Sequence, residues 1–203
     1  PLPDKHHRQH IPSGYAGTAA TIDAMRGMVE HGKRDNRIKQ LAIKLISGCA
    51  EKDYECFARK VFEYIRSLRY VLDPVGVEAV ATPWQIIENR GGDCDDFAVL
   101  GCALLESMGL PCEFVTLKGN PSSSEFTHVY FRVKIGNKFI PLDCTMDKPF
   151  GWAPPGKYER KYWPASAESA SYIHNDTRDI AGLGCDECGY DCGGDCGLSG
   201  FWI

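Results

Sequence analysis

The chain lacks the features that would place it in a membrane or on a nucleic acid. None of its apolar runs approaches the roughly 20 residues that a membrane-spanning helix needs. Its net charge is −4 over 203 residues, so there is no basic excess to attract phosphate groups or anionic lipid. Residues 1–10 are polar and rich in histidine, which is not the pattern of a signal peptide. We therefore predict a globular protein that binds neither nucleic acid nor membrane.

Cysteine is abundant, but its spacing is not that of a small disulfide-stapled domain. Four of the ten cysteines crowd the last twenty residues, and the other six are scattered singly. Several scattered cysteines fall within apolar patterns, where a free thiol behaves as a small buried hydrophobe. The scattered set comprises Cys49, Cys56, Cys94, Cys102, Cys112 and Cys144. We expect a reducing compartment, and hence a cytoplasmic location.

The C-terminal cysteines form a group of their own. They are separated by two, three and three residues, lie among glycines, and comprise Cys185, Cys188, Cys192 and Cys196. Four thiolates can hold one structural zinc ion, although this spacing matches neither a zinc ribbon nor a ferredoxin. Two local disulfides, or a tail with free thiols, are the alternatives. The apolar end at residues 201–203 is expected to dock on this domain or on a protein partner.

Apolar periodicity divides the chain into a helical part followed by strands. Spacings of three and four predict four helices, near residues 22–32, 38–46, 57–68 and 97–108. Alternation and turn residues predict three strands, at 113–117, 128–135 and 138–145. Residues 73–90 contain two prolines and a glycine and should be mostly loop, in which residues 84–87 could form a short turn of helix.

This order of elements predicts an α+β fold. We expect a polar arm over residues 1–18 and one catalytic domain over 19–150. An irregular extension, rich in aromatic residues and cysteine, should follow over 151–203.

Cys94 opens the fourth predicted helix. Asp93 is a suitable N-cap for that helix, and a helix N-terminus lowers the pKa of a cysteine. Negative charge nearby raises this pKa, and three carboxylates flank Cys94, those of Asp93, Asp95 and Asp96. A thiolate here would therefore need a paired histidine. The alternative is a buried thiol beside an ordinary helix cap. A cation site on the three acids is disfavoured, because successive residues at a helix start point in different directions.

His128 and Asp143 lie on two strands that a Gly-Asn turn joins. If Ile135 pairs with Lys138 across this turn, Asp143 lies diagonal to His128 on the same face of the hairpin. Diagonal neighbours are about 7–8 Å apart, within reach of a side-chain hydrogen bond. Cys94, His128 and Asp143 could thus supply a nucleophile, its base and the group that orients the base.

Three blocks carry a resemblance to a known family. They are residues 91–96 (GGDCDD), 126–130 (FTHVY) and 140–145 (IPLDCT). Together they resemble the signature of the transglutaminase-like superfamily, strongly over residues 82–145. From about residue 21 the chain is similar to stand-alone bacterial and phage members. The resemblance implies a papain-like α+β fold in which a helix that begins with cysteine packs on an antiparallel sheet.

The resemblance also implies thiol acyl chemistry without a required cofactor. Cys94 would attack a protein or peptide amide and form a thioester, His128 would move the proton, and Asp143 would orient the imidazole. The backbone N–H of Cys94 would be one oxyanion donor, and Gln85 or Trp84 a second, unless these two side chains simply pack. Hydrolysis is favoured over transfer to an amine. The alternative is a non-enzymatic structural or assembly component, for example in a phage virion, that retains the fold.

Overall fold

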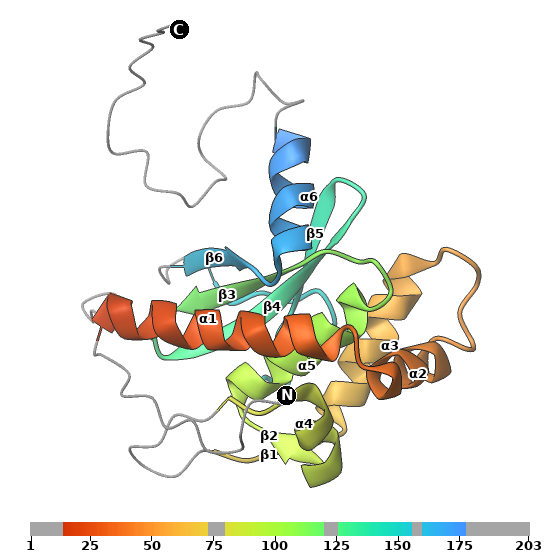
Figure 1. The fold of residues 1–203 in the computed structure, drawn as a ribbon, viewed down its shortest axis with the longest axis horizontal. Coiled ribbons are helices and arrows are strands. Elements are labelled where there is room, and N and C mark those ends of the chain that lie inside the picture. The colour runs from red at the N-terminus through yellow and green to blue at the C-terminus, as the bar shows by residue number, and fades with distance from the viewer. Residues whose placement is uncertain (1–13, 73–79, 120–125, 156–159, 178–203) are drawn as a thin grey trace, which may run out of the picture.

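The computed structural model describes residues 14–72, 80–119, 126–155 and 160–177 (Figure 1). Several sequence predictions lie outside these residues. They are the first part of the polar arm, the apolar end at 201–203, and the zinc site at Cys185, Cys188, Cys192 and Cys196.

Six helices and six strands make up the described part of the chain. The helices are α1 (Gly14–Gly32), α2 (Asn36–Leu45), α3 (Tyr54–Arg66), α4 (Pro83–Asn89), α5 (Cys94–Glu106) and α6 (Ala167–Thr177). The strands are β1 (Arg69–Tyr70), β2 (Gly91–Gly92), β3 (Cys112–Leu117), β4 (His128–Ile135), β5 (Lys138–Leu142) and β6 (Arg160–Pro164). Within these residues, every helix is too short or too polar to span a bilayer. The predicted α+β class is confirmed.

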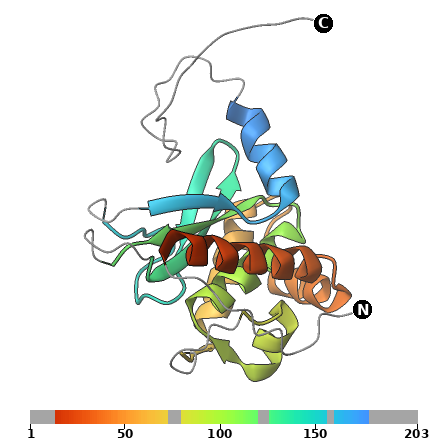
Figure 2. The ribbon, with the colours of Figure 1, turned by 60° about the vertical axis from the view of Figure 1, so that its left-hand side comes forward.

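Helix α5 is the centre of the molecule. It packs against β4 of the sheet on one side and against α1, α3 and α4 on others (Figures 1 and 2). All residues from Asp95 to Leu105 are buried, so the helix has no solvent face, whereas its sequence predicted a single apolar face. Gly101 allows the close approach to the sheet, because a Cβ there would lie 2.2 Å from the ring of Phe131 on β4.

The main sheet has the strand order β5-β4-β3-β6 and is antiparallel throughout. Ile135 pairs with Lys138, as the turn predicted, and the register runs on to Phe131 opposite Leu142. Val129, Phe131 and Val133 face the core as expected. A second, smaller cluster of Val115, Leu117 and Tyr130 occupies the other face of the sheet.

Three further features differ from the sequence predictions. Helix α1 begins at Gly14, inside the predicted arm, and α4 forms a full seven-residue helix within the predicted loop. The extension after residue 150 is not irregular throughout, since β6 completes the sheet and α6 follows it. Trp163 on β6 is buried, and its indole N–H donates to Thr116 Oγ1 on β3 at 3.0 Å. The sheet is therefore completed from the predicted extension.

Two of the scattered cysteines are paired, which the sequence did not predict. Cys49 and Cys56 form a disulfide across the connection between α2 and α3, with their Cα atoms 5.9 Å apart. A disulfide is typical of oxidising compartments and argues against the predicted reducing, cytoplasmic location. The free cysteines in the described residues are Cys94, Cys102, Cys112 and Cys144.

Candidate active site

Cys94 is the first residue of α5, and its neighbours fix that position. The carboxylate of Asp93, the predicted N-cap, accepts from the N–H of Asp96 at 3.5 Å. Asp96 in turn accepts from the N–H of Ala81 at 2.9 Å and so holds the segment before α4 against the start of α5. A Cβ on Gly92 would lie 2.5 Å from the Asp96 carboxylate, so this approach needs glycine.

His128 and Asp143 meet as the hairpin register predicted. His128 Nε2 lies 2.9 Å from Asp143 Oδ2. The other carboxylate oxygen of Asp143 accepts from the N–H of Thr145 at 3.1 Å and from its hydroxyl at 2.7 Å. Burial alone would raise the pKa of Asp143, but the hydrogen bond and charge of His128 and the bonds from Thr145 outweigh it and lower that pKa. Asp143 is therefore an ionised, buried anchor for the imidazole.

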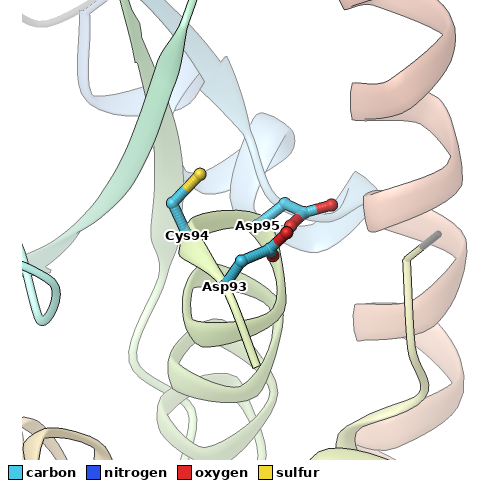
Figure 3. A group of neighbouring side chains, drawn as sticks. All are labelled: Asp93, Cys94 and Asp95. Atoms are coloured by element: carbon cyan, nitrogen blue, oxygen red, sulfur yellow. The ribbon is translucent and has the colours of Figure 1, made fainter. Parts of the chain in front are cut away.

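Cys94 lies against the strand that carries this pair. Helix α5, which begins with Cys94, packs on β4, and the backbone of Val129, the residue after His128, acts to lower the pKa of the Cys94 thiol. Figure 3 shows the Cys94 side chain pointing away from the carboxylates of Asp93 and Asp95. The structure thus brings the predicted nucleophile to the strand that carries the predicted base.

The surroundings of Cys94 favour the neutral thiol. Burial is the largest effect and raises the pKa of Cys94 to about 12; the charges of Asp95 and Asp93 act in the same direction, as the sequence indicated. Hydrogen bonds with the backbone of Val129 and Asp95 act against this rise. A nearby base must therefore accept the proton before Cys94 can act as a nucleophile.

The two side chains predicted as further oxyanion donors have partners on or next to α4. Gln85 Oε1 accepts from the N–H and the hydroxyl of Thr82, at 3.1 and 2.9 Å, and so completes a capping box. Trp84 donates its indole N–H to Glu88 at 2.8 Å, and Arg37 stacks on its ring. These contacts fit the alternative of simple packing, and an oxyanion role for either side chain stays a prediction.

One group of side chains at the site has the composition of a metal site. Asp93, Cys94 and Asp95 each place one ligand atom within 4.8 Å of the others (Figure 3). The sequence disfavoured a cation site on the three acids, and Asp96 turns away from this group to Ala81. Acidic groups at a helix start are common without an ion, and we assign no metal here.

No pattern in the sequence predicted that Tyr70 lies beside α5. This residue pairs with Gly92 in the short parallel sheet of β1 and β2, and its ring contacts Phe97 on α5. A single tyrosine between a helix and a loop belongs to no motif, so only its position in the fold reveals it.

Fold and site together define a class of protein: an α+β domain with a cysteine at the start of its central helix and a His–Asp pair on the adjoining sheet. Residues 39–144, just over half of the chain, match the model of the transglutaminase-like superfamily. The chain belongs to this superfamily. Among curated proteins, none is significantly similar to it.

Solved structures with a similar fold are distant in sequence. A proposed cysteine protease from Cytophaga hutchinsonii is 22% identical with a TM-score of 0.44, and the match covers 54% of this chain and 37% of that one. A proposed protease from Parabacteroides distasonis is 14% identical with a TM-score of 0.49, covering 64% of this chain and 27% of that one. Calcium-bound LapG from Legionella pneumophila is 16% identical with a TM-score of 0.49, and the match covers 76% of this chain and 98% of LapG. This chain thus spans well under half of the first two proteins.

Proposed function

We propose that this protein is a cysteine acyl-transfer enzyme that acts on protein or peptide amides, with hydrolysis favoured over transfer to an amine. The observation that carries the proposal is the 2.9 Å contact of His128 with the buried Asp143, beside β4, on which the helix that begins with Cys94 packs. Membership of the transglutaminase-like superfamily supports it. The chemistry needs no cofactor, and zinc at the C-terminal cysteines is a separate proposal, as is a protein partner for the C-terminal tail.

The ring nitrogens of His128 take different roles in this scheme. Because Nε2 is held by Asp143, Nδ1 is the nitrogen left to accept the proton of the Cys94 thiol. The sulfur then attacks the carbonyl carbon, and the negative charge passes to the carbonyl oxygen. The tetrahedral intermediate collapses to a thioester as the amine leaves with the proton from His128. Water, deprotonated by the same imidazole, hydrolyses the thioester to a carboxylate and restores the thiol.

The start of α5 supplies a place for the developing oxyanion. The first N–H groups of a helix have no carbonyl partner within the helix, and the N–H of Cys94 is the first of α5. The nucleophile and one oxyanion donor therefore belong to the same residue.

An activated ester tests the proposal with little dependence on substrate recognition. We expect the wild-type protein to turn over p-nitrophenyl acetate through an acetyl thioester at Cys94, identified by peptide mass spectrometry after acid quenching. Cys94→Ala should abolish turnover. His128→Ala should lower it about 100-fold or more, as removal of a general base does. Labelled casein, with and without a primary amine such as dansylcadaverine, then separates hydrolysis from amine transfer.

The matched control is Cys102→Ala, which removes a buried thiol elsewhere on α5 and should retain turnover. Equal p-nitrophenol release by wild type and Cys94→Ala, with no acetyl adduct on Cys94, would overturn the proposal. That result would favour the alternative of an assembly component that keeps the fold without the chemistry.

A further inference from the structure

Tyr70 is held beside the turn of helix that carries Cys94. It aligns with Gly92, two residues before the cysteine, and the N–H of Val71 donates to the Gly92 carbonyl at 2.9 Å. Its ring meets that of Phe97 edge-on, with centroids 6.1 Å apart. Phe97 is three residues after Cys94, so both lie on one face of α5. Backbone pairing and ring packing together fix the tyrosine ring next to the nucleophile.

The strand that holds Tyr70 presents apolar surface to solvent. Tyr70 is 49% exposed, Val71 48% and Leu72 73%, although all three are large and apolar. Val71 turns the other way, since its Cγ2 lies 3.3 Å from the position of a Cβ on Gly91. The Tyr70 ring contacts α5 through Phe97, and alternation continued past the end of β1 predicts that Leu72 lies on the same side as Tyr70. Clustered exposed apolar groups next to a nucleophile are typical of a binding surface.

The Tyr70 hydroxyl stays protonated at this site. Burial raises its pKa to about 12, and the charges of Cys94, Asp93, Asp95 and Asp143 add to that rise. The ring is therefore an uncharged surface in otherwise acidic surroundings.

We propose that Tyr70 and Leu72 form one wall of the acyl-binding site and select peptide substrates with a large apolar side chain next to the scissile carbonyl. This inference rests on the proposed function and names its substrate class. An apolar side chain against the wall would hold the carbonyl carbon over Cys94. Tyr70 is thus a specificity-determining residue, and its ring, not its hydroxyl, contacts the apolar side chain of the substrate.

Peptide chloromethyl ketones measure this preference directly. The Cys94 sulfur displaces chloride from the ketone and forms a C–S bond, while the thiol proton goes to His128 or to buffer. The rate constants for N-acetyl-leucine and N-acetyl-glycine chloromethyl ketones are compared by peptide mass spectrometry. Each is divided by the rate with iodoacetamide, which has no side chain and reports the reactivity of the thiol alone.

We expect wild-type Cys94 to react about tenfold faster with the leucine reagent, because partial burial of a leucine side chain contributes roughly 1.4 kcal/mol. Tyr70→Ala should reduce this ratio to below about threefold, and Tyr70→Phe should keep it. Tyr172→Ala, which removes an exposed tyrosine from α6 on the opposite end of the molecule (Figure 1), is the matched control and should also keep it. Thermal unfolding checks that each variant folds, and Leu72→Ser provides a second test of the wall.

Three results would overturn the inference: no preference for leucine in the wild type, an unchanged preference in Tyr70→Ala, or equal loss in Tyr70→Phe and Tyr70→Ala. The last would assign the effect to the hydroxyl. Absence of labelling at Cys94 by either ketone, up to about pH 9 where an ordinary thiol ionises, would overturn it as well. Because alkylation needs no turnover, a protein that fails with p-nitrophenyl acetate but keeps the leucine preference would overturn the proposed function alone.

Discussion

At the scale of single residues, the carboxylates next to Cys94 control how readily it ionises. Asp95→Asn keeps the shape of the side chain and removes one negative charge, so it should lower the pKa of Cys94. We expect iodoacetamide to label Cys94 about two- to tenfold faster at about pH 8, because each pKa unit changes the thiolate fraction tenfold. Asp93→Asn should have a smaller effect, since Asp93 contributes less to the rise. Equal or slower labelling of Asp95→Asn would contradict this account.

The buried Asp143 gives the protein a stability that depends on pH. Its pKa in the folded protein is lowered, so its stabilising contribution is present above the ordinary value of 3.8 and is lost as the pH falls through the lowered value. Asp143→Asn should cost about 1–3 kcal/mol in the free energy of unfolding near pH 6, the usual cost of removing a hydrogen bond to a charged group. Urea denaturation of both proteins should show this gap narrowing as the pH is lowered toward about 3. If the difference in unfolding free energy between the two proteins stays constant over that pH range, the destabilisation does not come from the lost charge of Asp143.

At the scale of secondary-structure elements, the contact between α5 and β4 sets the distance between Cys94 and His128. Gly101→Ala would put a methyl group into the ring of Phe131. We expect a loss of about 1–3 kcal/mol in unfolding free energy, as for other overpacked cores, and a lower turnover of p-nitrophenyl acetate.

Gly27→Ala is the matched control for this substitution. Gly27 lies within α1, where a Cβ would meet nothing within 4 Å. Alanine there should stabilise the protein by about 0.4–1 kcal/mol and leave turnover unchanged. A Gly101→Ala protein as stable and active as the wild type would show that the helix can shift on the sheet without cost.

The sequence predicted the elements that local patterns define. The N-cap and apolar run predicted α5 with Cys94 at its start, and the Gly-Asn turn between β4 and β5 was sufficient to bring His128 to Asp143. The sequence did not predict β6, because a five-residue strand with a proline at its end gains its stability from pairing with β3. Nor did it predict the contact of Tyr70 with Phe97 or the Cys49–Cys56 bond, since both depend on where distant or looped segments lie in space.

At the scale of the whole molecule, a buried lysine ties the two ends of the described fold together. Lys33 at the end of α1 contacts Glu106 of α5 at 3.2 Å and Glu168 of α6 at 3.0 Å. The side chains of Lys33 and Glu106 are only 5% and 4% exposed. Burial lowers the pKa of Lys33, but its hydrogen bonds with Glu168, Glu106 and Glu30 outweigh that effect and raise it. Lys33 is therefore positively charged across the neutral range.

Lys33→Met should destabilise the protein by about 3–5 kcal/mol at neutral pH, because Glu106 would be left buried without a cation. Burial already raises the pKa of Glu106, and loss of Lys33 should raise it further. A raised folded pKa means that the penalty grows as the pH rises from the ordinary glutamate value to the folded one. Unfolding measured at about pH 4 and pH 8 should thus show a larger deficit at the higher pH. Arg34→Met, which removes an exposed partner of Glu30, should cost less than about 1 kcal/mol.

The strand order has a consequence for how the chain is made. Leu117 on β3 pairs with His128 on one side but with Arg160 on the other. A nascent chain that has emerged only to residue 150 would hold Cys94, His128 and Asp143, yet one edge of β3 would still lack its partner strand. Unpaired edges are sites of aggregation during synthesis. This edge of β3 therefore stays open until β6 has been synthesised and pairs with it.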